Sequence, residues 1–307
     1  MSEKIFDVAI IGSGPAGYSA SIYASRYNLT NVIFGKLPGG TISEAHKVCN
    51  YPGFEEITGL DLSQKFFNHA KSFGAKMEMK SVTDIKKEGD IFNLEIDSGD
   101  IFKSKAVILA TGTKRKKLAI PGEDGYLGKG VSYCATCDSN FFKEKIVGVV
   151  GGSNAATTAA LLLSEVANKV YIIYRRDALR GDQKWVDAVL KEEKIEVVYN
   201  TLVVGLEGDG KLERVKLSKE FNGSDILDLD GLFIEIGSEP NADLPQRIGI
   251  EMDDSGYVKV GEDQSTNIEG IWAAGDMTTN SNGFQQVITA TSEGAIAANS
   301  VYKYLKA

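Results

Sequence analysis

Apolar runs and glycine-rich turns follow one another in the same order at two places in the chain. Residues 6–11 form a short apolar run that stops at a glycine cluster, and small residues resume from Tyr18. Residues 146–150 form a second such run, followed by small residues from Thr157 and by another apolar stretch at 169–174. An apolar run that ends at glycines and restarts as a small-residue helix is typical of a strand–helix–strand unit. The pattern predicts two such units.

A third apolar run, residues 270–276, again ends at a glycine and an acid. Small residues then recur with helical spacing, which predicts a long helix from about Gln286 to Leu305. Both elements lie far from the first unit in sequence. If they complete the first domain, the second domain is an insertion in it.

The predicted fold is α/β, with two Rossmann-like dinucleotide-binding domains of three-layer ββα/β character, the second inserted into the first. The polar or proline-bearing stretches 114–121 and 240–245 are suitable places for the two crossings. We expect residues 1–116 and 245–307 to form the first, discontinuous domain and residues 117–244 to form the second.

The charge of the chain disfavours two classes of partner. The 307 residues include 42 acidic and 34 basic side chains, which gives a net charge of -8. A duplex nucleic acid or an anionic membrane surface would be repelled, so neither is expected as a partner. The start of the chain lacks the pattern of a signal peptide, and no run has the apolar length of a membrane span. A cytoplasmic location is expected.

The first glycine cluster has the spacing Gly12-x-Gly14-x-x-Gly17. Gly12 permits a tight turn, Gly14 lets the backbone approach a pyrophosphate, and Gly17 lets the helix pack closely on the strand. The start of the following helix offers free N–H groups and a positive dipole to phosphates. This cluster predicts a dinucleotide site in the first domain.

The second cluster is a degraded version of the first. Aligned in the same way, it has Gly151, Ser153 and Ala156 at the three positions. Alanine is an accepted variant at the last position, whereas a side chain at Ser153 can obstruct close approach of a pyrophosphate. The sequence therefore predicts a second nucleotide site with an impaired phosphate turn.

Three arginines, Arg175, Arg176 and Arg180, follow the strand where the adenosine ribose of a nucleotide would lie. Guanidinium groups at this point suit a 2′-phosphate through charge-assisted hydrogen bonds, whereas a carboxylate would suit a free ribose hydroxyl. We therefore expect NADP(H) in preference to NAD.

Two of the three cysteines are spaced Cys134-x-x-Cys137, and Asp138 follows directly. An attacking thiolate and a resolving thiol are what disulfide exchange requires, and an adjacent carboxylate can move a proton to the leaving thiolate. A zinc site is poorly supported, because the chain has two histidines and no second C-x-x-C, and no metal is expected. Cys49 stands alone and is predicted to be a small buried residue.

Together these motifs resemble the low-molecular-weight thioredoxin reductases, class II FAD-containing pyridine nucleotide-disulfide oxidoreductases, over essentially the whole chain. The matching segments are Gly-Ser-Gly-Pro-Ala-Gly (12–17), Asn-Tyr-Pro-Gly-Phe (50–54), Ala-Thr-Gly-Thr (110–113), Cys-Ala-Thr-Cys-Asp (134–138), Arg-Arg-Asp (175–177) and Ala-Ala-Gly-Asp (273–276).

The resemblance implies FAD in the first domain and NADP(H) in the second, with Asp276 near the ribityl and phosphate region of FAD. The candidate FAD contacts are Gly12, Ser13, Gly14, Pro15, Ala16, Gly17, Gly39, Gly40, Thr41, Asn50, Thr111, Gly112, Gly275, Asp276, Gln285, Gln286 and Val287. The candidate NADP(H) contacts are Gly151, Gly152, Ser153, Asn154, Ala155, Arg175, Arg176 and Arg180.

The resemblance also implies roles for the redox residues. Cys137 would be the sulfur nearer the flavin, Cys134 would attack the substrate disulfide, and Asp138 would be the acid/base. The family is homodimeric, reduces a thioredoxin or thioredoxin-like disulfide, and alternates between two domain orientations. Two short crossings are consistent with such a hinge.

The chain departs from the family pattern at five places, three of them in the second domain. The departures are Gly-Gly-Ser-Asn-Ala-Ala at 151–156, the replacement of the following acids by Thr157, Thr158 and Ala159, Tyr174 before Arg175-Arg176, Gln285-Gln286 in place of Arg-Gln, and Gly39-Gly40-Thr41 in place of Gly-Gly-Gln.

These departures leave the electron donor open. The main hypothesis is electron flow from NADPH through FAD to Cys134–Cys137 and on to a thioredoxin-like disulfide. Ser153 and the lost acids favour a different donor, such as reduced ferredoxin or a deazaflavin, whereas the arginines favour NADPH. A dithiol oxidase that passes electrons to oxygen and a redox sensor without turnover are further alternatives.

Overall fold

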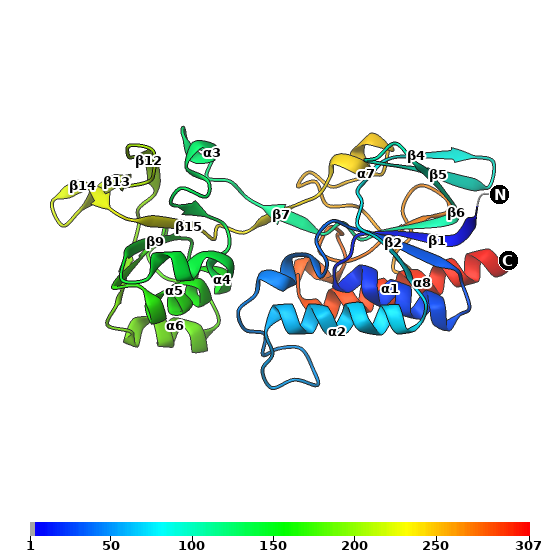
Figure 1. Cartoon of the computed structure of the whole chain (residues 1–307), viewed down its shortest axis with the longest axis horizontal. Coiled ribbons are helices and arrows are strands. Elements are labelled where there is room, and N and C mark those ends of the chain that lie inside the picture. The colour runs from blue at the N-terminus through cyan, green and yellow to red at the C-terminus, as the bar shows by residue number, and fades with distance from the viewer. Residues whose placement is uncertain (1–3) are drawn as a thin grey trace. The chain divides into compact units, whose positions relative to one another are not determined.

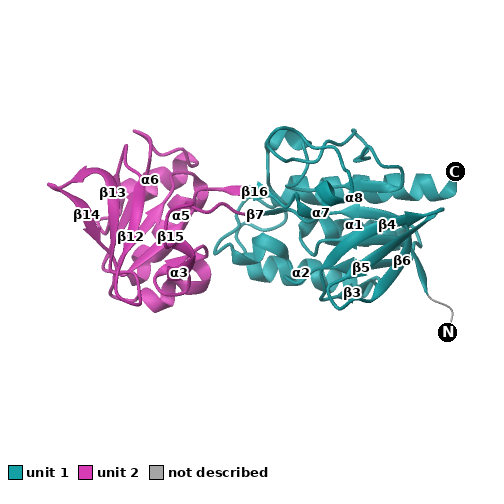
Figure 2. Cartoon of the chain, turned by 90° about the horizontal axis from the view of Figure 1, so that it is seen from above, with its two compact units in different colours: residues 1–114, 239–307 teal, residues 115–238 magenta. Residues whose placement is uncertain are grey.

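The computed structural model describes residues 4–307, which divide into two compact units (Figure 2). Unit 1 consists of the chain up to Lys114 together with Glu239–Ala307, and unit 2 consists of Arg115–Ser238. The second unit is thus inserted in the first. The domain boundaries expected from the sequence stay predictions. The same holds for the nucleotide assigned to each unit.

Unit 1 is built on a mixed seven-stranded sheet with the order β3-β2-β1-β6-β5-β4, in which β17 pairs with β6 (Figure 1). Its centre is parallel, because β1 pairs with β2 and with β6 in parallel register, while β4, β5 and the first half of β6 form an antiparallel meander. The strands are β1 (Ile5–Ile11), β2 (Asn31–Phe34), β3 (Lys76–Glu78), β4 (Val82–Glu88), β5 (Ile91–Ile96), β6 (Ile101–Leu109) and β17 (Ile271–Ala273).

Alternate residues of β1 face two different cores, so both faces of this sheet are buried. Val8 and Ile10 pack with the helices, whereas Ala9 and Ile11 pack with the meander and the segment around Ile250. The three long helices lie together on one side of the sheet (Figure 1). They are α1 (Pro15–Arg26), α2 (Gly59–Ser72) and α8 (Val287–Lys306); the short helices are α7 (Asp243–Arg247), η1 (Gly40–Glu44) and η3 (Ser281–Gly283).

Unit 2 is built on a parallel five-stranded sheet with the order β11-β10-β9-β15-β8. Its strands are β8 (Val131–Ser132), β9 (Ile146–Val150), β10 (Lys169–Ile173), β11 (Ile195–Val198) and β15 (Gly231–Ile234). The helices are α3 (Glu123–Tyr126), α4 (Ala135–Asp138), η2 (Ser139–Phe142), α5 (Asn154–Val166) and α6 (Gln183–Lys191). β9, α5 and β10 are the predicted second strand–helix–strand unit, which the structure confirms.

The two faces of the unit 2 sheet are covered by different layers. Val147 and Val149 pack against α5, whereas Val150 packs against a three-stranded antiparallel sheet. That sheet consists of β12 (Val203–Glu207), β13 (Arg214–Phe221) and β14 (Ser224–Asp228). Helix, parallel sheet and antiparallel sheet are the three layers expected from the sequence.

The chain passes between the units along β7 (Thr113–Arg115) and β16 (Ser238–Pro240), which pair with each other. Within unit 2, Arg115 forms an ion pair with the buried carboxylate of Glu235 at 2.8 Å. This ion pair fixes the chain where it enters unit 2.

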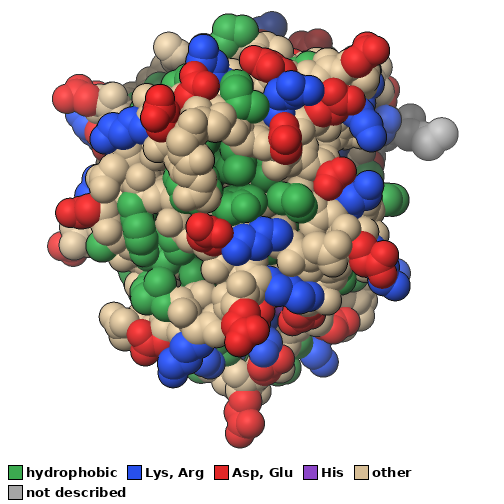
Figure 3. Space-filling view, turned by 90° about the vertical axis from the view of Figure 1, so that its left-hand side faces the viewer, with side chains coloured by type: hydrophobic (Ala, Val, Ile, Leu, Met, Phe, Trp, Pro, Cys, Tyr) green, Lys and Arg blue, Asp and Glu red, His purple; other side chains and the backbone are tan. Residues whose placement is uncertain are grey.

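On the end of unit 2 shown in Figure 3, acidic and basic side chains are interspersed, with apolar side chains between them. Across residues 4–307 no helix combines the length and the apolar character required to cross a membrane.

Candidate active site

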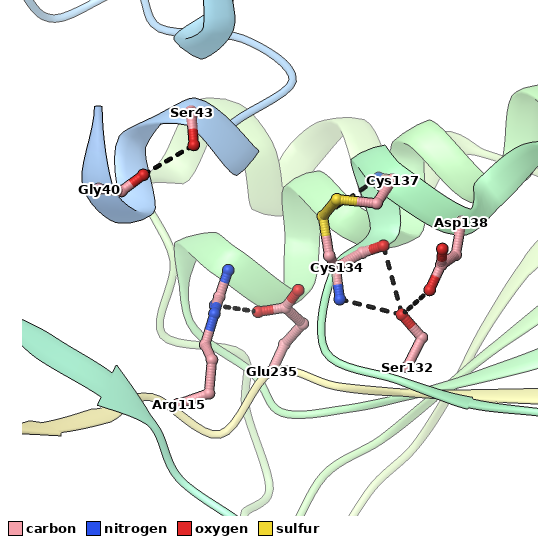
Figure 4. Close-up of a disulfide and its surroundings, with 8 residues drawn as sticks. All are labelled: Gly40, Ser43, Arg115, Ser132, Cys134, Cys137, Asp138 and Glu235. Carbon is pink, nitrogen blue, oxygen red and sulfur yellow. Dashed lines mark hydrogen bonds and ion pairs between the residues drawn. A yellow bond between two sulfur atoms is a disulfide. The ribbon is translucent and has the colours of Figure 1, made fainter. Parts of the chain in front are cut away.

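The structure joins the two cysteines of the C-x-x-C motif in a disulfide within unit 2 (Figure 4). Cys134 follows β8 and caps the start of α4, and its sulfur accepts a hydrogen bond from the N–H of Cys137 at 3.1 Å. Cys134 is half-buried and Cys137 is exposed. A disulfide held at the edge of a parallel sheet, with one sulfur accessible, is suited to thiol–disulfide exchange.

Asp138 is tied to the disulfide through Ser132, which the sequence patterns did not identify. The Ser132 hydroxyl donates to Asp138 Oδ2 at 2.7 Å and accepts from the N–H of Cys134 at 3.0 Å (Figure 4). Ser132 is almost fully buried, so it has little freedom to take another partner. The arrangement orients a carboxylate beside the dithiol, where it can accept or donate a proton.

The second glycine turn lies between β9 and α5. Gly151 has φ +143°, and a Cβ added there would lie 2.2 Å from the carbonyl oxygen of Glu235, so only glycine fits. A Cβ at Gly152 would meet the ring of Tyr174 at 2.5 Å. Ser153 caps the start of α5 in ordinary extended conformation, with φ -100° and ψ -171°, and its side chain makes no capping hydrogen bond. The serine therefore causes no backbone strain.

The loop after β10 is fastened to the start of α5. The N–H of Arg180 donates to the carbonyl of Gly152 at 2.6 Å, and the N–H of Asp182 donates to Asn154 Oδ1, also at 2.6 Å. Ala155 lies one residue further along α5. These bonds bring the loop and the helix N-terminus together, as a site for a phosphorylated nucleotide requires.

The three predicted arginines of this loop are all exposed. Arg175, Arg176 and Arg180 form no ion pair with any residue in the range 4–307. Guanidinium groups that are not neutralised by carboxylates are available to an anionic ligand.

The first glycine turn, in unit 1, has the packing that its sequence predicts. Gly12 has φ +129°, and an added Cβ would lie 1.9 Å from the carbonyl oxygen of Ala110. A Cβ at Gly17 would lie 1.9 Å from the carbonyl oxygen of Gly12, so the helix rests directly on the turn. Gly14, by contrast, has no atom closer than 3.9 Å to such a Cβ. The space above the N-terminus of α1 is therefore open, while the turn below it is tightly packed.

The remaining residues of this turn are held against the segment that follows β2. The Ser13 hydroxyl donates to the carbonyl of Leu37 at 2.9 Å, and the N–H of Gly39 donates to the carbonyl of Ser13 at 2.7 Å. Gly40 lies beside Gly14, and Thr41 follows it on the surface. Pro15 and Ala16 are the first two residues of α1.

Asn50, Gln286 and Val287 meet at the N-terminus of α8. The side-chain amide of Asn50 donates to Gln286 Oε1 at 2.8 Å, Gln286 caps the helix, and Val287 is its first residue. The helix α8 of unit 1, like α1, thus begins among the residues predicted to contact FAD. Cys49, next to Asn50, is exposed, so the prediction that it is buried was wrong. Its neighbour Val48 takes the inward position, through its pairing with Ile57.

The strand ends of β6 and β17 supply the other predicted contacts of unit 1. Asn241, which the sequence patterns did not identify, donates from Nδ2 to the carbonyl of Thr111 at 2.7 Å and from its N–H to the carbonyl of Gly112 at 3.0 Å. Gln285 donates to the carbonyl of Asp276 at 3.1 Å. Asp276 itself follows Gly275 directly after β17.

Asp276 has the properties of a ligand contact. Burial and, to a smaller extent, the nearby carboxylate of Glu293 together raise the pKa of its carboxyl group to about 6. Within residues 4–307 the Asp276 carboxyl group makes no hydrogen bond. A desolvated carboxyl group without donors gains most from a ligand that supplies hydroxyl groups. Together with the open N-terminus of α1, it shows that these residues fit a dinucleotide such as FAD.

The predicted site residues thus form two groups, one in each unit. Unit 1 gathers the turn at 12–17, the segment 39–41, Asn50, the strand end at 111–112 and the segments 275–276 and 285–287. Unit 2 gathers the disulfide, Asp138, the turn at 151–155 and the arginines.

Comparison with known proteins agrees with this arrangement. Residues 6–294 match the model of the pyridine nucleotide-disulphide oxidoreductase family. A thioredoxin reductase of Listeria monocytogenes is 40% identical over 307 residues, covering 99% of this chain and 95% of the relative.

Two solved structures share both fold and sequence with this chain. The thioredoxin reductase of Lactococcus lactis superposes with a TM-score of 0.92 at 35% identity, covering 98% of this chain and 99% of the other. That of T. acidophilum also has a TM-score of 0.92, at 36% identity, with coverage of 99% and 100%.

Proposed function

Because the chain belongs to the pyridine nucleotide-disulphide oxidoreductases and, among them, to the thioredoxin reductases, we propose that it reduces the disulfide of a thioredoxin. Electrons pass from NADPH through FAD to Cys134–Cys137 and then to the substrate. The observation that carries the proposal is the Cys134–Cys137 disulfide beside Asp138, in a chain with two nucleotide turns.

FAD is assigned to unit 1. The turn formed by Gly12, Gly14 and Gly17 would hold the pyrophosphate at the N-terminus of α1, and Asp276 would accept hydrogen bonds from ribityl hydroxyl groups. When bound, FAD accepts a hydride from a nicotinamide and delivers two electrons to a disulfide. The open space at Gly14 and the desolvated carboxyl group of Asp276 support this assignment.

NADPH is assigned to unit 2. The N-terminus of α5 would hold the diphosphate, and the exposed guanidinium groups of Arg175, Arg176 and Arg180 would bind the 2′-phosphate. The bonds of the Arg180 backbone and of Asn154 bring the arginine loop to the helix, which supports the assignment.

The chemistry of the dithiol follows from its surroundings. Two electrons and two protons convert the Cys134–Cys137 disulfide to two thiols. The Cys134 thiolate then attacks the substrate disulfide to form a mixed disulfide, and the Cys137 thiolate breaks that bond, which releases the substrate as a dithiol and re-forms the Cys134–Cys137 disulfide. Asp138, oriented by Ser132, supplies the proton to the departing thiolate.

The apolar side chain of Phe141, exposed to 79%, lies three residues after Asp138 in unit 2. An exposed aromatic residue four positions after Cys137 in the chain favours contact with a protein substrate. We include in the proposal a homodimeric assembly and a cytoplasmic location, both of which the family resemblance supports.

A second candidate keeps the same flavin and dithiol but takes electrons from a donor other than NADPH, such as reduced ferredoxin or a deazaflavin. Ser153 favours it, because an exposed residue with a side chain stands at the N-cap of α5, where the fingerprint has its middle glycine. A dithiol oxidase would be recognised by oxygen consumption with a small dithiol and no nicotinamide.

The test compares three proteins for reduction of thioredoxin with NADPH. Cys137→Ser removes one sulfur of the disulfide, and we expect it to retain FAD but to lose turnover. Cys49→Ser removes the exposed, isolated thiol and serves as the matched control, with the activity of the wild type. Full turnover by Cys137→Ser would contradict the dithiol mechanism.

A further inference from the structure

Glu293 is a buried acid that the reaction described above does not use. It lies in the second turn of α8 and is 5% exposed. The next residue, Gly294, rests on α1 so closely that an added Cβ would lie 2.1 Å from the carbonyl oxygen of Ala16. This contact fixes the helix and therefore the position of Glu293. A carboxylate buried in this way is stable only when donors surround it.

All three donors to Glu293 come from one loop, residues 275–281, which follows β17. Oε2 accepts from the N–H of Gly275 at 2.7 Å and from the hydroxyl of Thr278 at 3.0 Å, and Oε1 accepts from the hydroxyl of Ser281. No lysine or arginine among residues 4–307 forms an ion pair with Glu293. The carboxylate therefore binds the loop at its start, its middle and its end.

Asp276 lies inside this loop, between the Gly275 N–H and the Thr278 hydroxyl that Glu293 binds. Gln285 binds the main-chain carbonyl of Asp276, but its carboxyl group makes no hydrogen bond within residues 4–307, so no polar contact of the side chain holds it in place. Glu293 is also the one charged group of the described chain that acts on the pKa of Asp276. Glu293 thus contributes both to the position of Asp276, through the loop, and to the raised pKa of its carboxyl group.

We propose that Glu293 is a positioning residue of the flavin site, whose carboxylate holds loop 275–281 in the conformation that presents Asp276 to the hydroxyl groups of FAD. The inference rests on the proposed function only in assigning FAD to unit 1. It requires neither NADPH nor thioredoxin.

Two substitutions separate the hydrogen bonds of Glu293 from its charge. Glu293→Ala removes all three acceptors, and we expect the FAD dissociation constant to rise by about 10- to 100-fold, as for loss of hydrogen bonds to a charged group. In Glu293→Gln the amide oxygen can still accept from Gly275 and Thr278, and the amide nitrogen can donate to the Ser281 hydroxyl. We expect this variant to bind FAD within about threefold of the wild type at alkaline pH.

The pH dependence of FAD binding shows an effect that a merely structural role would not produce. FAD hydroxyl groups that donate to Asp276 favour its ionised form, so the affinity falls as the pH drops through the pKa of Asp276. Removal of the Glu293 charge removes one cause of the raised pKa. In Glu293→Gln the fall in affinity should therefore move to lower pH than in the wild type.

The experiment titrates FAD into the apoproteins between about pH 5 and about pH 8 and follows the quenching of flavin fluorescence. Glu262→Gln, which removes an exposed carboxylate of unit 1, is the matched control and should follow the wild type at every pH. A wild type that binds no FAD would contradict the proposed function itself.

The inference on Glu293 is overturned by a folded Glu293→Ala that binds FAD as tightly as the wild type. If Glu293→Ala loses its circular dichroism signal, Glu293→Gln decides: a fall in affinity at lower pH supports the inference, and a fall at the wild-type pH overturns it.

Discussion

Replacing Ser153 by glycine tests whether the second nucleotide turn is obstructed. Ser153 and Gly14 are the N-caps of α5 and α1, with φ -100° and ψ -171° for the serine and φ -90° and ψ -174° for the glycine. The two backbones have nearly the same conformation, so glycine needs no rearrangement at position 153. The substitution changes only the space above the helix N-terminus.

The expected gain follows from the hydrogen bonds that a phosphate makes at this place. If the side chain at 153 keeps the phosphate from one of the free N–H groups of α5, the wild type lacks one hydrogen bond to a charged group, which contributes about 1.5 kcal/mol or more. Recovery of one such bond lowers the dissociation constant for NADP⁺ by about tenfold. The cost in stability is small, because the Ser153 side chain makes no capping hydrogen bond and Ser→Gly at an N-cap costs a few tenths of a kcal/mol.

Isothermal titration with NADP⁺ measures this change without any turnover, and the KM for NADPH should fall in parallel. The mirror variant Gly14→Ser is the control for unit 1. It should fold, because serine adopts that conformation at 153, but it should bind FAD at least about tenfold more weakly. If Ser153→Gly binds NADP⁺ no better than the wild type, the serine does not obstruct the site; weaker binding would mean that its hydroxyl contacts the phosphate.

Three further predictions concern single side chains. Ser132→Ala should lower the kcat for thioredoxin reduction by about tenfold, because Asp138 loses the hydrogen bond that orients it. The rate at which NADPH reduces the flavin, measured by stopped flow, should stay unchanged. An unchanged kcat would exclude Ser132 from a role in proton transfer. Arg176→Gln should raise the KM for NADPH by about tenfold or more and leave the KM for NADH unaffected. An equal rise in the KM for NADPH and the KM for NADH would contradict binding of the 2′-phosphate by Arg176. The pKa of Asp276 is raised to about 6, so FAD affinity should be constant above that pH and should decrease below it as the carboxylate is protonated. Asp276→Asn should abolish this pH dependence, and a wild type with constant affinity down to about pH 5 would show that FAD does not bind the carboxylate.

The features that the sequence predicted are those encoded by neighbouring residues. The strand, glycine turn and helix at 5–26 follow from the local order of an apolar run, a glycine cluster and small residues, and the close contact of Gly17 with Gly12 lies inside the turn. The helix expected from about Gln286 to Leu305 was likewise confirmed, as α8 spans Val287–Lys306. The cysteine pair was recognisable because its two members are three residues apart.

The features that the sequence did not predict depend on distant residues. Ser132 is a common residue two positions before Cys134, and its role appears only once β8 and α4 orient Asp138 toward it. In the sequence, Glu293 looks like any acidic residue of a helix. The groups that donate hydrogen bonds to it lie up to 18 residues earlier in the chain. Cys49 was predicted to be buried from residue type alone, whereas pairing of Val48 with Ile57 turns it outward.

Anaerobic titration of the purified flavoprotein with NADPH, followed by the visible absorbance of the flavin, tests the central claim most directly. The account predicts that the flavin is bleached by a near-stoichiometric amount of NADPH and that its absorbance returns when oxidised thioredoxin is added. A flavin that stays oxidised with NADPH but is bleached by a strong chemical reductant would contradict the account, and unit 2 would then have to serve a different electron donor.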